Sequence, residues 1–386
     1  MTYSANWNYP TNIIVGAGRI KELADLCKTM DMHSPLLITD PGLAALPMLQ
    51  KVVDDVKASG IECGLFSAIK ANPTGENVED GVNFYKKNNH DGVIAFGGGS
   101  ALDAAKAVAL MVGQQIPIWD FEDVGDNWTH VNVKAMAPVI AVPTTAGTGS
   151  EVGRASVITD HIQHIKRIIF HPAMLPAHVI LDPELTIGLP AMITAATGMD
   201  ALSHNLEALC SPFYHPLAEG IAVEGIRLVQ EYLPRAVKDG TDIEARTQML
   251  VCSTMGATAF QKGLGAMHAL AHPLGALFDA HHGTLNAILM PYVLKANYEK
   301  IEKRIDRLTR YMNLNDTGFD SFLNWVIQLR KDLGIPNSLS EININDTQAE
   351  KIAKMAFEDP SAGGNPISFS VAQYQRIFKD AVAGKL

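Results

Sequence analysis

The first half of the chain alternates short apolar runs with amphipathic segments. Four runs have the length and composition of buried strands, at residues 36–40, 62–68, 92–100 and 138–145. Segments with the apolar spacing of a helix lie at residues 44–57, 77–88 and 101–112. This alternation predicts a doubly wound, Rossmann-like parallel sheet, whose ligands gather at the carboxyl ends of the strands.

The pattern changes in the middle of the chain. Residues 151–187 are typical of a mixed connection with two strand-like stretches, VIT and KRIIF, and DPELTIGLP at 182–190 is typical of a boundary. Beyond it the periodicity is helical almost throughout, over residues 191–210, 216–237, 242–261, 266–277, 284–296, 298–312, 317–332 and 347–357. We therefore predict an α/β nucleotide domain over 1–187 and an all-helical domain over 188–386.

Composition narrows the class of protein. The chain has 386 residues, of which 47% are hydrophobic and 19% charged, as expected for two globular domains. The formal net charge is −10 and there is no Lys/Arg-rich run, so we expect no nucleic-acid partner. The start does not resemble a signal peptide, and no apolar run reaches the length of about 18 residues that indicates a membrane span. Four dispersed cysteines without CxxC spacing indicate buried thiols in a reducing compartment, and hence a cytoplasmic protein.

Two loops at consecutive predicted strand ends are rich in glycine and hydroxyl groups. GGGSALDAAK at 97–106 lies between a strand and a helix, where backbone N–H groups and the positive helix end can bind a phosphate. TTAGTGSE at 144–151 follows the next apolar run. A single GGGS is as often a tight turn, but two such loops favour a nucleotide site.

Asp40 lies at the end of the first strong strand. A carboxylate there can accept hydrogen bonds from ribose hydroxyls and repel a 2′-phosphate, which favours NAD over NADP. The alternative is a helix N-cap before Pro41. Gly16 and Gly18 resemble part of a dinucleotide fingerprint, but Lys21 occupies the place of its third glycine, so we interpret both as turn residues.

Histidines concentrate at 265–283, GAMHALAHPLGALFDAHHG, which holds four of the chain's 13. His268 and His272 are four residues apart and share a helix face, as do Asp200 and His204 in TGMDALSHNLEA. Taken alone, each of these residues is equally well explained without a metal, the acid as part of a first helical turn and each histidine as part of the core. Asp200, His204, His268 and one histidine of the pair at 281–282 make one carboxylate and three imidazoles, a donor set that suits Fe(II) or Zn(II).

These motifs are those of a known family. GGGSALDAAK, PTTAGTGSE, TGMDALSHNLEA and GAMHALAHPLG followed by HHGTLNAILMP resemble the iron-containing (group III) alcohol dehydrogenases, in order and spacing, over nearly the whole chain. The resemblance implies a dehydroquinate synthase-like architecture, NAD and iron as cofactors with zinc as an alternative metal, and a small alcohol or aldehyde as substrate. A homodimer or a higher homo-oligomer is also expected.

The resemblance also implies roles for individual residues. The metal ligands would be Asp200, His204, His268 and His282. His272 would line the substrate pocket and relay a proton, and Asp40 would match the acid associated with NAD preference. The remaining cofactor positions would be Asn72, Gly98, Gly99, Ser100, Asp103, Thr144, Thr145, Thr148 and Lys166.

The chain departs from the family at one ligand. Where many members have Pro-His-Gly, it has His281-His282-Gly283, so either histidine is able to coordinate, and register favours His282. HHGTLNA together with AFQKGLG at 259–265 is most similar to the family's 4-hydroxybutyrate dehydrogenases. Lys262 and Arg154 are candidate cations for a substrate carboxylate, with ordinary charged side chains as the alternative.

The predicted reaction is reversible hydride transfer between NAD and a small primary alcohol, with an ω-hydroxy acid such as 4-hydroxybutyrate as one candidate substrate. The metal would stabilise the alkoxide, and His272 would pass the proton towards solvent, in the cleft between the two domains. Two alternatives stay open: a dehydroquinate synthase-like lyase and a non-enzymatic protein that binds metal and nucleotide.

Overall fold

A computed structural model describes residues 11–163 and 165–386. Within them the chain forms two compact units. The sheet unit comprises 11–145 and 149–188, and the helical unit comprises 146–148 and 189–386.

The sheet unit is built on six parallel strands in the order β1-β8-β5-β4-β2-β3. Their bounds are β1 Asn12–Val15, β2 Pro35–Ile38, β3 Gly64–Phe66, β4 Gly92–Gly97, β5 Val139–Pro143 and β8 His178–Leu181. The four predicted strands are β2 to β5, which confirms the doubly wound sheet. The strand order reverses between β2 and β4, so their carboxyl ends flank the position where such sheets bind ligands.

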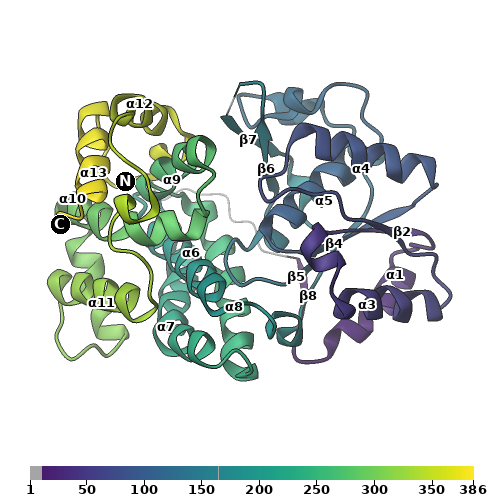
Figure 1. Cartoon of the computed structure of the whole chain (residues 1–386), viewed down its shortest axis with the longest axis horizontal. Helices are drawn as coiled ribbons and strands as arrows, with labels where there is room; N and C mark the ends of the chain where they lie inside the picture. Colours follow the sequence, from purple (N-terminus) through teal and green to yellow (C-terminus); the bar gives the residue numbers. More distant parts are fainter. Residues whose placement is uncertain (1–10, 164) are drawn as a thin grey trace. The chain divides into compact units, whose positions relative to one another are not determined.

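Helices cover both faces of this sheet (Figure 1). α1 (Leu23–Thr29) and α3 (Pro47–Ala58) pack on one face, and α4 (Gly75–Lys87) and α5 (Gly99–Met111) lie on the other. β2, β4 and β5 are buried at every residue because helices cover them on both sides. Short α2 (Pro41–Ala44) follows β2 directly. The predicted helices therefore correspond to α3, α4 and α5.

The two strand-like stretches predicted within 151–187 form an antiparallel hairpin of β6 (Ala155–Asp160) and β7 (Ile165–Phe170). Its position is fixed by α5, since the Val157 N–H donates to Asp103 Oδ2 at 3.0 Å. Arg167 on β7 forms ion pairs with Asp160 and Glu122.

The helical unit contains the predicted helices with two differences. Its helices are α6 Ala191–Cys210, α7 Pro216–Lys238, α8 Ile243–Ala259, α9 Ala266–Phe278, α10 His282–Tyr311, α11 Phe319–Asp332, α12 Ala349–Glu358 and α13 Val371–Ala383. The prediction of separate helices at 284–296 and 298–312 is wrong, because both belong to α10. Asn297 at the expected break pairs its amide with Asn365 and so does not cap a new helix. α13 was not predicted.

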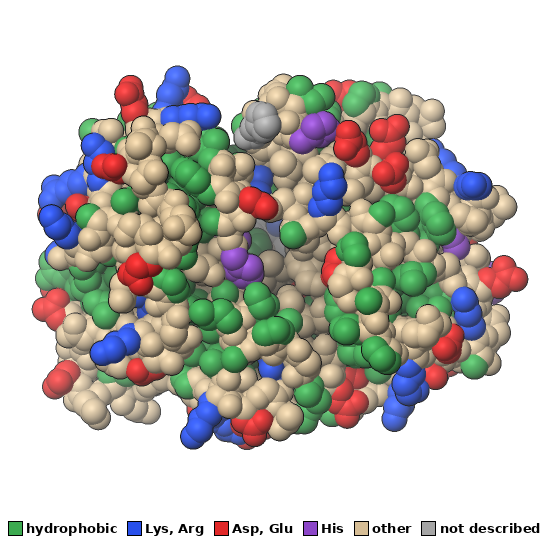
Figure 2. All heavy atoms as spheres, in the orientation of Figure 1, with side chains coloured by type: hydrophobic (Ala, Val, Ile, Leu, Met, Phe, Trp, Pro, Cys, Tyr) green, Lys and Arg blue, Asp and Glu red, His purple; other side chains and the backbone are tan. Residues whose placement is uncertain are grey.

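The structure bears out the expectation of buried cysteines. Cys27, Cys63, Cys210 and Cys252 are all buried free thiols, as predicted. Figure 2 shows acidic and basic side chains interspersed over the face in view. In the described part of the chain, no helix combines the length and the apolar character that crossing a bilayer requires.

Candidate metal and cofactor sites

Three helices bring the four residues expected as metal ligands together. Asp200 and His204 lie one turn apart on α6, and His268 lies on α9; one ligand atom from each falls within 4.8 Å of the others. His282, the first residue of α10, places Nε2 3.6 Å from Asp200 Oδ1, with its ring centroid 5.2 Å from that of His268. Asp200, His204 and His268 are buried. The residues converge as the resemblance implies.

Glycines permit this convergence. A Cβ added to Gly283 would lie 2.2 Å from the carbonyl oxygen of Ala196, so α10 approaches α6 directly beside His282. A Cβ added to Gly256 on α8 would lie 3.0 Å from the Cβ of His204. The first distance excludes a side chain and the second is tighter than most Cβ contacts, so the helix carrying Asp200 and His204 packs closely against both α10 and α8.

Burial and charge set the protonation states of the first two residues. Burial acts to raise the pKa of Asp200, but His204, His282 and His268 and a hydrogen bond from Asn286 hold that pKa well below its ordinary value. Burial lowers the pKa of His204 to about 4, although Asp200 opposes the shift. A charged carboxylate and a neutral imidazole are the forms that bind a cation.

Two polar residues that the sequence analysis did not identify touch this cluster. Asn286, one turn after His282 on α10, places Nδ2 2.8 Å from Asp200 Oδ1 and 3.2 Å from Nε2 of both His268 and His282. Glu207 on α6 places Oε2 2.7 Å from His268 Nδ1. Burial acts to lower the pKa of His268, but Glu207, with smaller contributions from Asp200 and Asp359, raises that pKa above its ordinary value.

His272 and His281 differ from the other histidines of the motif. His272 Nδ1 lies 2.8 Å from Asp359 Oδ2, and its ring stacks on that of His282 at a centroid distance of 5.5 Å. Burial acts to raise the pKa of Asp359, but His272 and Ser361 hold it below its ordinary value. His281 is exposed at the N-cap of α10. His282, and not His281, therefore lies in the cluster.

Lys262 has a structural environment. Its Nζ donates to the carbonyl oxygens of Ala208, Leu209 and Ser211 at 2.8–3.1 Å and lies 3.1 Å from Glu219. The three N–H groups of the ammonium are used at the C-terminal end of α6, where a cation is stabilised by the helix dipole. These contacts favour the alternative to a substrate-binding role for Lys262, namely a structural one. Arg154 lies in the sheet unit, over the ring of Phe170.

The two glycine-rich loops lie side by side at the carboxyl ends of β4 and β5. The Thr144 N–H donates to the Gly97 carbonyl at 2.9 Å, and a Cβ on Gly98 would lie 3.4 Å from Thr145 Cγ2. Gly97 has φ +143°, which only glycine adopts readily. α5 begins at Gly99 without a side-chain cap, so its first N–H groups point to the loop. This arrangement suits an anionic phosphate group.

The other expected cofactor residues lie around these loops. The Ser100 hydroxyl donates to the carbonyl of Ala71, next to Asn72, and Lys166 Nζ donates to Asn72 Oδ1 at 3.0 Å. Asp103 accepts hydrogen bonds on both oxygens from the chain itself, from Ser150 Oγ at 2.5 Å and from Val157 N. Asp103 thus anchors the second loop through its hydrogen bond from Ser150.

Thr148 and Asp40 complete the expected set. Thr148 lies in the short 146–148 segment of the helical unit, where a Cβ on Gly147 would lie 2.9 Å from Thr197 Cβ. Asp40 directly follows β2 and caps α2, since Oδ1 accepts the Leu43 N–H at 3.0 Å. The capping interpretation is confirmed, and Oδ2 takes no part in the cap.

The chain thus has a parallel sheet with glycine-rich loops and, in the helical unit, a carboxylate–histidine cluster. Comparison with known proteins identifies a family with both features. The model of "Iron-containing alcohol dehydrogenase" matches residues 10–183, and that of "Fe-containing alcohol dehydrogenase family, C-terminal" matches residues 194–382. The chain belongs to the iron-containing alcohol dehydrogenase family, and it is an oxidoreductase. This membership sets aside the lyase and the non-enzymatic alternatives.

Individual relatives match over nearly their full lengths. A 4-hydroxybutyrate dehydrogenase of Cupriavidus necator is 37% identical, with 97% of this chain and 99% of that protein covered. An NAD-dependent methanol dehydrogenase of Bacillus methanolicus is 32% identical, covering 98% and 100%. Among solved structures, a 1,3-propanediol oxidoreductase has a TM-score of 0.92 at 31% identity, covering 98% of this chain and 100% of that one.

Proposed function

We propose that the chain catalyses the reversible, NAD-dependent oxidation of a small primary alcohol to its aldehyde with a divalent metal held by Asp200, His204, His268 and His282. The observation that carries this proposal is the cluster of one carboxylate and three imidazoles, in which all but His282 are buried. These donors fit Fe(II), and zinc accepts the same set. Family membership favours iron as the native metal.

The chain's own residues have distinct tasks in this reaction. Backbone N–H groups at the start of α5 bind the cofactor pyrophosphate, with Thr144, Thr145 and Thr148 on the second loop. Asp40 accepts hydrogen bonds from the ribose, and Asn72 and Lys166 lie beside the same loops. NAD is supported by this site and by the relatives named for its use. NAD held by these residues would supply the hydride acceptor for the oxidation.

His272 is proposed to move the proton. Its Nδ1 faces the Asp359 carboxylate at 2.8 Å, so the Nδ1–H donates there and the opposite nitrogen is able to accept the alcohol proton. A bound metal supplies Lewis acidity, which lowers the pKa of the alcohol and so favours its deprotonation. Asp359 fixes the imidazole orientation.

The substrate class rests on the relatives. The 37% identical 4-hydroxybutyrate dehydrogenase supports an ω-hydroxy acid such as 4-hydroxybutyrate, and the 1,3-propanediol dehydrogenase of Citrobacter freundii, at 32%, supports an uncharged diol. The test is NADH formation by protein reconstituted separately with iron and with zinc, using 4-hydroxybutyrate, 1,3-propanediol and methanol. We expect turnover with at least one substrate. Absence of turnover with all of them and with their aldehydes overturns the proposal.

Assembly and location extend the proposal. We propose that the chain forms a homodimer or a higher homo-oligomer. We also propose a cytoplasmic location, with which the four free, buried thiols are consistent. Light scattering on the purified protein tests the assembly, and a monomer at micromolar concentration contradicts it.

Lys262→Met is expected to destabilise the protein without a selective effect on acidic substrates. The variant removes the ammonium that donates to buried carbonyl oxygens. The neighbouring Arg304 donates to the carbonyls of residues 209–211 but not to that of Ala208, so the Ala208 carbonyl loses its side-chain donor. The expected loss in the free energy of unfolding is about 2 kcal/mol. Denaturant unfolding measures it, and KM is compared for 4-hydroxybutyrate and 1,3-propanediol. An increase in KM for the acid alone would restore Lys262 as its binding partner.

A further inference from the structure

Glu207 is a buried carboxylate with three converging donors. It lies three residues after His204 on α6 and is 4% exposed. Its Oε1 accepts the Met267 N–H at 2.7 Å, and its Oε2 lies 2.7 Å from both the Gly265 N–H and His268 Nδ1. One side chain of α6 thus contacts both the backbone and the ring at the start of α9.

The contact with His268 defines which ring nitrogen carries hydrogen. A carboxylate only accepts hydrogen bonds, so the His268 hydrogen lies on Nδ1. In the neutral ring Nε2 then carries the lone pair, and Nε2 is the atom that faces Asn286 Nδ2 at 3.2 Å within the cluster. The same contact fixes the rotation of the ring about its long axis.

The contacts with the backbone fix the position of the ring. The first N–H groups of α9 have no partner within the helix, and Glu207 accepts two of them. A Cβ on Gly265 would lie 2.9 Å from Glu207 Oε1, so helix and carboxylate are in close contact. His268 lies in this first turn, and displacement of the helix end would move its Nε2.

We propose that Glu207 is a positioning residue for the metal site, which holds His268 in the tautomer and orientation that direct Nε2 to the cation. The inference rests on the proposed metal site and adds a residue outside the ligand set. Its carboxylate also offsets part of the cation's charge within a buried environment.

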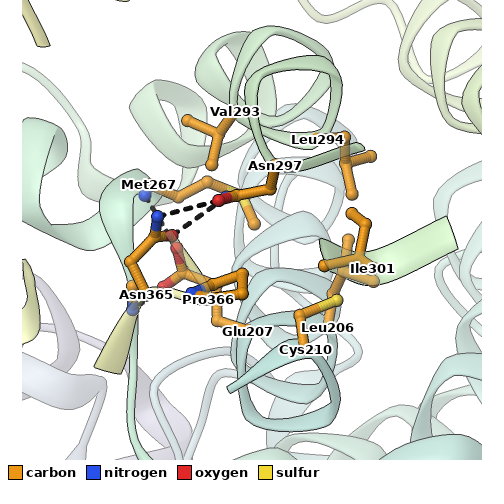
Figure 3. Close-up of a pocket in the computed structure, with 11 residues that line it drawn as sticks. Leu206, Glu207, Cys210, Met267, Val293, Leu294, Asn297, Ile301, Asn365 and Pro366 are labelled. Atoms are coloured by element: carbon orange, nitrogen blue, oxygen red, sulfur yellow. Dashed lines mark hydrogen bonds between the residues drawn. The ribbon is translucent and has the colours of Figure 1, made fainter. Parts of the chain in front are cut away.

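Asn365 offers a matched control at the same helix end. Its Oδ1 accepts the Ala266 N–H at 3.1 Å, and its amide pairs reciprocally with that of Asn297 at 2.8–2.9 Å. Figure 3 shows this amide pair beside a small cavity that Glu207 and Met267 also line. Asn365 therefore supports α9 as Glu207 does, but its hydrogen bonds do not include a histidine.

The experiment measures the dissociation constant for Zn²⁺ by chelator competition in the full-length metal-free protein. Glu207→Gln keeps the side-chain volume and replaces one acceptor oxygen with an NH₂ donor. The N–H groups of Gly265, Met267 and His268 then no longer all have an acceptor. We expect the dissociation constant to rise about 10- to 100-fold. The absorption spectrum of the Co²⁺-loaded variant should change with it, because the coordination geometry is disturbed. Asn365→Ala should lower the unfolding temperature while its Zn²⁺ dissociation constant stays within about twofold.

Two further outcomes separate the possibilities. An unchanged dissociation constant in Glu207→Gln, or an equal rise in Asn365→Ala, overturns the positioning role. If Glu207→Gln does not fold, Glu207→Asp carries the test, since it keeps both acceptor oxygens on a shorter chain, and unchanged Zn²⁺ affinity there overturns the inference. A wild-type chain that binds no divalent metal contradicts the proposed function instead.

Discussion

His268→Ala is expected to lower kcat/KM by roughly 10³-fold and to abolish tight metal binding while the fold is retained. The substitution removes the imidazole that lies among Asp200, His204 and His282, so that only three donors remain. Glu207 keeps its two backbone donors at α9, which limits the structural cost of the variant. Metal content after reconstitution, steady-state kinetics and circular dichroism measure the three effects together.

His281→Ala is the matched control for this prediction. It removes a histidine from the same motif, but that side chain is exposed and caps α10 without a side-chain hydrogen bond. Metal content and kcat/KM should stay within about twofold of the wild type. Full metal occupancy in His268→Ala would contradict the ligand assignment, and loss of metal in His281→Ala would contradict the choice of His282.

Local spacing brought Asp200 and His204 together and the family resemblance selected His282, but neither indicated how the cluster is supported. Asp200 and His204 had to share a face of α6 because a helix brings residues four apart together. Glu207 and Asp359 were not identified because their partners are distant in sequence: Glu207 reaches Gly265 across 58 residues, and His272 reaches Asp359 across 87. Local signals were available for two residues, since Asn286 lies four positions after His282 and Glu207 is, with Asp200, one of the two acidic residues of α6.

The same distinction between local and long-range information applies to the fold. Apolar runs identified β2 to β5, of which β2, β4 and β5 are buried at every residue, whereas β1 and β8 were not predicted. β1 lies at the sheet edge and none of its residues is buried, so its apolar pattern is weak. Lys262 stayed an open candidate because the sequence does not show that three backbone carbonyls accept hydrogen bonds from its ammonium. Periodicity reports which face is buried, while the partner of a buried polar atom depends on the packed structure.

Removal of the charge at Asp40 is expected to change the cofactor preference of the enzyme. Asp40 follows β2, and the Gly97–Gly98 loop follows β4, its neighbour in the sheet, where the strand order reverses. A 2′-phosphate bound there would lie near the carboxylate, and repulsion of about 1–3 kcal/mol follows at the effective dielectric of a protein surface. Asp40→Asn should therefore raise kcat/KM for NADP relative to NAD by about 10- to 100-fold.

The choice of substitution separates this role from helix capping. Asp40 Oδ1 caps α2 through the Leu43 N–H. Asparagine caps as well as aspartate, and glycine costs only a few tenths of a kcal/mol, so Asp40→Asn and Asp40→Gly should both relax the preference with little change in stability. Asp40→Ala should relax it too, but with a loss of about 1 kcal/mol in the free energy of unfolding. Unchanged NAD/NADP selectivity in all three variants would leave Asp40 with the capping role alone, since the carboxylate charge would then make no contribution to cofactor choice.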